Sequence, residues 1–89
     1  MPDIYVARKG GDSFEVEVSE GGASTRHYVT ATEDDVERYG GGVEAEALVE
    51  ASFVFLLERE PKEAILGKFE LPVIERYFPE YPDRIAEYL

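Results

Sequence analysis

Few side chains in this chain could carry out acid, base or nucleophilic chemistry. His27 is the only histidine, and histidine is the usual general base and a common metal ligand near neutral pH. In the strand pairing that we expect, His27 faces inward beside Val16, which favours a structural role. The chain has no cysteine, so disulfides, thiolate catalysis and cysteine–zinc sites are excluded. We therefore expect no catalytic residue, no metal and no cofactor.

Carboxylates are abundant, but their spacing matches no familiar kind of site. The acidic run at 33–35 lacks the spacing of a calcium-binding EF-hand loop. An acid/base pair needs two carboxylates in different environments, whereas these cluster on helix faces that we expect to be exposed. The three glycines at 40–42 are not followed by the lysine of a phosphate-binding loop. The residues therefore favour a protein without enzymatic activity.

The formal net charge of −11, from 20 acidic and 9 basic residues, limits the partners. Repulsion from phosphates disfavours nucleic acid and anionic membrane surfaces. Nine of the acids lie in residues 31–60 beside only Arg38 and Arg59, which indicates a solvated helix face or a surface that meets a basic partner. The longest apolar run, Phe53–Leu57, is too short to cross a bilayer, and no secretory signal is recognisable, so we expect a cytoplasmic protein.

Aromatic residues near the end of the sequence are its most suggestive feature. Tyrosine and phenylalanine bring large contact areas at low entropic cost, so they are effective anchors at interfaces. They could instead simply cap the core. Together with the histidine and part of the apolar run, they form a set of candidate interface or pocket residues: His27, Phe53, Leu57, Tyr77, Phe78, Tyr81 and Tyr88.

The elements that must position these residues are strands first and helices after. At 89 residues the chain allows a single domain, 1–89, and this order predicts an α+β fold with a β-meander in 1–31 and a helical part in 32–89. We expect three antiparallel strands within 3–31, joined by glycine-rich turns. Because facing residues share one side of a sheet, Ile4 should pair with Val18, and Val16 with His27. An alternative register of the second hairpin would bury Arg26 instead.

The helical part should consist of a short helix, a long central helix and short C-terminal helices. Thr32 can cap the first helix, which ends at the three glycines. The central helix, 43–60, is apolar on every side at Phe53–Leu57. We expect one stripe (Leu48, Ala51, Phe55) to pack on the sheet, and the other (Phe53, Leu56, Leu57) to lie under short helices that begin near Pro61, Pro72 and Pro82.

Two segments, Ser52–Pro61 and Leu71–Pro82, carry a resemblance to a known family. Through these segments, roughly residues 50–84 resemble the C-terminal half of a family of short uncharacterised bacterial proteins. The resemblance implies a bacterial, cytoplasmic context. It implies no activity and brings no functional residues.

These observations favour a non-enzymatic protein-interaction domain, whose partner could be another protein or a second copy in a homodimer. The reason is a helix that is apolar on all sides in a chain with little material to cover it. A second hypothesis is a small-molecule-binding domain with a pocket between the sheet, His27 and the C-terminal tyrosines, although no residue pattern supports a particular ligand. A third is an acidic inhibitor or antitoxin-like partner of a basic protein.

Overall fold

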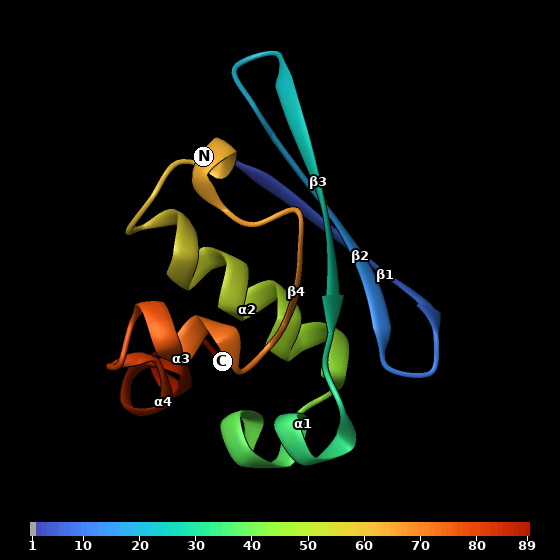
Figure 1. The fold of residues 1–89 in the computed structure, drawn as a ribbon, viewed down its shortest axis with the longest axis vertical. Helices are drawn as coiled ribbons and strands as arrows, with labels where there is room; N and C mark the ends of the chain where they lie inside the picture. Colours follow the sequence, from blue (N-terminus) through green and yellow to red (C-terminus); the bar gives the residue numbers. More distant parts are fainter. Residues whose placement is uncertain (1) are drawn as a thin grey trace.

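The fold, seen in a computed structural model that describes residues 2–89, is a mixed four-stranded sheet packed against helices (Figure 1). The strands are β1 (Asp3–Gly10), β2 (Ser13–Glu20), β3 (Ala23–Thr30) and β4 (Lys68–Glu70), in that order across the sheet. The helices are α1 (Glu33–Gly40), α2 (Ala45–Leu57), α3 (Val73–Tyr77) and α4 (Tyr81–Arg84), with single 3-10 turns at Lys62–Ala64 and Ile85–Tyr88. The predicted α+β class is confirmed.

Both predicted hairpin registers are confirmed. Ile4 pairs with Val18 across β1 and β2, and Val16 pairs with His27 across β2 and β3. The inward positions of β2 are fully buried, whereas Arg26 is exposed on the outer face. Alternation of apolar and polar residues decides the register. A slip by one residue would turn every buried side chain of the strand toward solvent.

The predicted three-stranded meander is incomplete, because β4 adds a fourth strand parallel to β3. Val29 is the partner of Phe69 in this pair. The backbone N–H of Tyr28 donates to the Gly67 carbonyl at 2.8 Å, and the N–H of Leu71 donates to the Thr30 carbonyl at 2.9 Å. The expectation that residues 32–89 are purely helical is therefore wrong.

Helix α1 begins and ends where the residue types predict. The Asp35 N–H donates to Thr32 Oγ1 at 3.1 Å, and the Thr32 N–H donates to Asp35 Oδ2 at 3.0 Å, which is a capping box. Gly41 ends the helix in the left-handed region, with φ of 60°, where a side chain would be strained.

Helix α2 is the central layer, with the sheet on one side and the C-terminal helices on the other (Figure 1). It is shorter than the predicted 43–60, since it begins at Ala45 and ends at Leu57. The Arg59 N–H donates to the Leu56 carbonyl, three residues earlier, so the chain tightens into a turn after Leu57. The apolar run is covered on two opposite flanks by the chain itself, since Phe53 and Phe55 are both fully buried.

The predicted faces of α2 are reversed for these two phenylalanines. The Phe53 ring lies 5.3 Å from His27 and 6.1 Å from Phe69, on the sheet side. The Phe55 ring lies 5.2 Å from Tyr81 and 5.8 Å from Tyr88, on the side of the C-terminal helices. Two residues apart on a helix means about 200° of rotation, so the two rings must face opposite ways, but the spacing does not say which faces the sheet.

The helix predicted to begin near Pro61 is a single 3-10 turn, Lys62–Ala64. Ile65 is already extended, with ψ of 134°, and the chain then runs into β4. The short helices that follow agree with the expected starts near Pro72 and Pro82.

Candidate functional site

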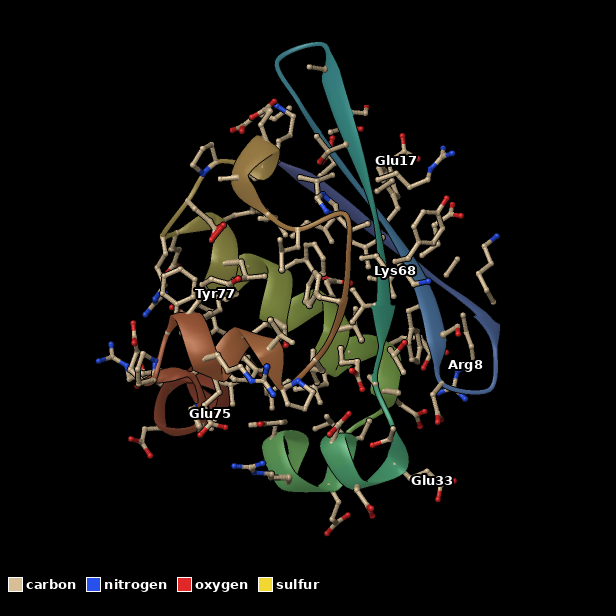
Figure 2. The ribbon with its side chains drawn as sticks, in the orientation of Figure 1. Arg8, Glu17, Glu33, Lys68, Glu75 and Tyr77 are labelled. Carbon is tan, nitrogen blue, oxygen red and sulfur yellow. The ribbon has the colours of Figure 1, made fainter. Side chains whose placement is uncertain are left out.

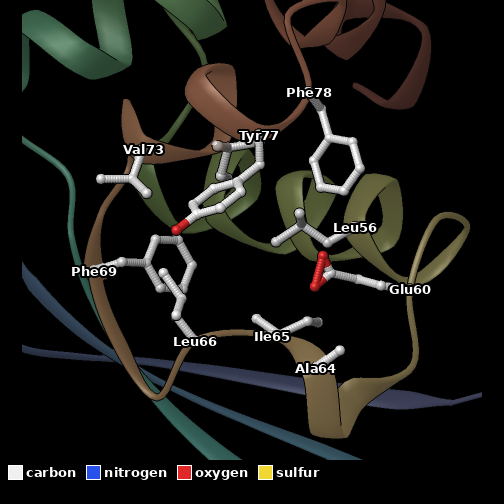
Figure 3. A pocket seen from close by; sticks show the side chains of 10 residues that line it. Leu56, Glu60, Ala64, Ile65, Leu66, Phe69, Val73, Tyr77 and Phe78 are labelled. Atoms are coloured by element: carbon white, nitrogen blue, oxygen red, sulfur yellow. The ribbon is translucent and has the colours of Figure 1, made fainter.

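An apolar groove lies between α2, the segment 64–69 and α3 (Figure 3). Its volume is about 160 Å³. Nine of its ten lining side chains are aliphatic or aromatic, and the tenth is a carboxylate. We call this set the groove: Leu56, Glu60, Ala64, Ile65, Leu66, Phe69, Val73, Ile74, Tyr77 and Phe78.

The rim of the groove presents large apolar side chains to solvent. Tyr77 is 65% exposed and Leu66 is 45% exposed, from opposite walls, while Ile74 and Phe69 lie buried at the base. Figure 2 shows Tyr77 well away from Arg8 and Glu33, which lie at the sheet and α1. Exposed apolar side chains that gather around a hollow are typical of a binding surface, whereas singly scattered ones are ordinary.

His27 positions one wall of the groove without entering it. Its Nδ1 lies 2.8 Å from the Leu66 carbonyl oxygen, and its Nε2 lies 2.8 Å from Thr25 Oγ1. A carbonyl oxygen only accepts hydrogen bonds, so Nδ1 is the donor to Leu66. The ring is 2% exposed and packs on Phe53. His27 therefore anchors the loop that carries Leu66.

Glu60 is the charged residue of the groove. Figure 3 shows its carboxylate directed toward the apolar side chains, beside Leu56. Burial raises the pKa of Glu60, because apolar surroundings disfavour the ionised form. No side chain among residues 2–89 forms a hydrogen bond or ion pair with this carboxylate.

A strand edge that pairs with no other strand of residues 2–89 borders the groove. In a parallel pair the backbone groups of alternate residues point to the neighbouring strand, and here Gly67 and Leu71 bond to β3. The backbone groups of Lys68 and Glu70 therefore point away from β3, and β4 is the last strand of the sheet. Phe69, between them, lines the groove. The edge and the groove thus form one continuous surface.

The structure divides the predicted site residues among three places. Tyr77 and Phe78 line the groove. Phe53 and Tyr81 are fully buried in the core, on opposite sides of α2, and Leu57 and Tyr88 are half-buried beside it. His27 lies on the sheet side. A pocket shared by His27 and the C-terminal tyrosines is therefore not formed, because the helix fills the space between them.

Most of the groove was not predicted from the sequence, and the clearest omissions are Glu60, Leu66 and Phe69. One local signal for the last of these was available. Polar and apolar residues alternate from Lys68 to Leu71 directly after Gly67, which is the pattern of a short strand.

Among residues 2–89 no cluster of three histidine, aspartate or glutamate side chains is arranged to hold a metal ion. No helix in that range combines the length and apolar character needed to cross a bilayer. No known protein family, curated protein or solved structure matches the chain. The resemblance of residues 50–84 to short bacterial proteins stays a prediction, and the fold and groove define a small α+β domain with an apolar site at a sheet edge.

Proposed function

We propose that the protein is a non-catalytic protein-interaction domain that binds an extended segment of a partner chain along β4 and in the groove. The observation that carries this proposal is the apolar groove directly beside a free strand edge. A peptide that adds a strand to an edge gains main-chain hydrogen bonds for affinity, and pockets beside the edge select alternate side chains. Lys68 and Glu70 offer the backbone groups, and the groove offers the pocket.

The volume of the groove supports a peptide side chain rather than a small molecule as its occupant. Sites for small molecules usually enclose about 300–1,000 Å³. The groove holds about 160 Å³, which is room for one side chain of a bound segment. The remainder of such a segment would lie outside the groove, along β4.

The apolar helix no longer argues for a homodimer, because the chain itself buries both Phe53 and Phe55. Under this proposal, a second copy of the chain would bind through the groove. Light scattering at micromolar concentration measures this. A mass twice that of the 10.0 kDa chain, lost on Tyr77→Ser, would identify a second copy as the occupant. We also propose a cytoplasmic location.

A library of random peptides displayed on phage tests the proposal. We expect the wild-type protein to select peptides, and a selected peptide to shift the amide resonances of Lys68 and Glu70 in the ¹⁵N-labelled protein. Tyr77→Ser should abolish this binding and leave the fold intact, because that side chain is largely exposed. Failure to select any peptide, or equal binding by the variant, would contradict the proposal.

A further inference from the structure

We infer that the groove takes an arginine side chain of the partner segment, whose guanidinium pairs with the carboxylate of Glu60. This inference rests on the proposed function. Its starting point is a single carboxylate set among nine apolar side chains, without a hydrogen-bond or ion-pair partner among residues 2–89.

Other carboxylates that approach the helical layer do have partners. Glu75 accepts hydrogen bonds from Arg38 at 3.1 Å and from the Tyr39 hydroxyl at 2.8 Å. Glu80 accepts from Arg59 at 3.1 Å. Glu60 differs because its carboxylate is partly removed from water and receives nothing in return. A cationic donor from a bound segment would supply the missing interaction, since charge-assisted hydrogen bonds are the strong ones.

An arginine fits the walls of the groove better than a lysine does. Guanidinium is planar, is more weakly hydrated than ammonium, and stacks on aromatic rings. Tyr77 and Phe78 supply aromatic walls on the same side of α2 as Glu60 (Figure 3). The chain shows the same combination internally, because the Arg59 guanidinium lies 3.6 Å from the centre of the Phe55 ring and pairs with Glu80.

The whole chain favours the same kind of partner. Its net charge of −11 attracts a basic segment from a distance and repels an acidic one. The Glu60 carboxylate then determines where the guanidinium of the bound segment lies in the groove. An experiment must separate the attraction by the net charge from the contact with Glu60. Glu50, an exposed glutamate of α2 outside the groove, provides a matched control.

The peptide selection described above becomes the test when it is repeated on Glu60→Gln and Glu50→Gln. Both variants lose one negative charge, but only the first loses the carboxylate of the groove. We expect arginine to be enriched at one position of the peptides selected by the wild type and by Glu50→Gln, and not by Glu60→Gln. Replacing that arginine with citrulline, its neutral analogue, should weaken binding to the wild type about tenfold to a hundredfold. On Glu60→Gln the two peptides should bind within about threefold of each other.

Each other result has a definite meaning. Peptides that bind the groove without a basic residue would overturn the inference and leave the proposed function standing. Equal arginine enrichment on Glu60→Gln would show general charge attraction and would also overturn it. Enrichment of lysine in place of arginine would refute the choice of guanidinium. Selection of no peptide at all would remove the proposed function, and the inference with it.

Discussion

A fully buried tyrosine hydroxyl is satisfied by one serine at the centre of the helical layer. Ser52 Oγ lies 2.7 Å from the Leu48 carbonyl and 2.7 Å from the Tyr81 hydroxyl. The single proton of the serine hydroxyl goes to the carbonyl, so Tyr81 is the donor to Ser52. Burial raises the pKa of Tyr81 far above its usual value, which keeps that proton in place at neutral pH.

This geometry predicts unequal costs for removing the two partners. Ser52→Ala leaves the buried tyrosine hydroxyl without an acceptor and should lower the free energy of unfolding by about 1–3 kcal/mol. Tyr81→Phe removes the donor, leaves Ser52 bonded to Leu48, and should cost only about 1 kcal/mol. The double variant should be close to Tyr81→Phe alone, because nothing unsatisfied then remains. Urea unfolding measures all three, and strictly additive losses would refute this account of the pair.

The raised pKa of Glu60 predicts a dependence of stability on pH. A carboxyl whose pKa is higher in the folded state than in the unfolded chain holds its proton more tightly when folded. Its contribution to stability is therefore present below the unfolded pKa and is lost as the pH rises through the folded value. The side chain of Glu60→Gln does not ionise, so the variant does not lose this stability as the pH rises. The variant should be more stable than the wild type at pH 7, and the difference should shrink as the pH falls toward about 4. A difference that stays constant across this range would contradict the prediction.

At the scale of elements, helix α2 contributes buried side chains to the core on two opposite sides. Phe53 packs on the sheet and Phe55 packs under the C-terminal helices, so each side of the helix closes a different part of the molecule. Five of the seven residues from Ala51 to Leu57 are fully or nearly fully buried. This burial explains why so short a chain can hold helices that would not be stable alone.

The two sides of α2 should respond separately to truncation of their phenylalanines. Phe53→Leu and Phe55→Leu should each cost about 1–3 kcal/mol, which a domain with a stability of about 5–15 kcal/mol can tolerate. Hydrogen exchange should then speed up in β3, β4 and the segment 61–67 for Phe53→Leu. For Phe55→Leu it should speed up in α3, α4 and the last 3-10 turn. The same exchange pattern from both variants would show that the two sides unfold as one unit.

At the scale of the whole molecule, charge opposes the compact state. The net charge is −11 and the radius of gyration is 11.9 Å. The screening length falls from about 30 Å at 0.01 M salt to about 8 Å at 0.15 M. Charges on all sides of the molecule therefore repel one another at low salt, and much less so at physiological salt.

Sodium chloride should consequently raise the melting temperature between about 0.01 M and 0.15 M. The ion pairs of the structure work against this trend only weakly, because exposed pairs contribute little. A variant with Glu20→Gln, Glu37→Gln and Glu50→Gln reduces the net charge from −11 to −8, and these three exposed residues form no ion pair within residues 2–89. Its melting temperature should be higher at low salt and should rise less. A fall with added salt in both proteins would mean that attraction outweighs repulsion.

Prediction from the sequence was most successful where neighbours in the chain decide the structure. The register of β1 and β2 follows from alternation in Phe14–Val18, and the ends of α1 follow from Thr32 and the glycines. Prediction was wrong where a partner distant in the chain decides. The stretch after Pro61 has apolar residues and a terminal glycine that suit a helix, yet His27 and Tyr28 bind its backbone and draw it into the sheet.

The sequence by itself determined the class of the fold, the two hairpins, the capped first helix and the burial of Phe53, Phe55 and Leu56, because these depend on local patterns of side chains. Only the tertiary structure decided that Lys68–Glu70 is a strand, which side of α2 each phenylalanine faces, and that Glu60, Leu66 and Tyr77 share a groove. The physical reason is that three residues form a strand only when another strand offers them hydrogen bonds, and β3 lies about forty positions earlier in the chain.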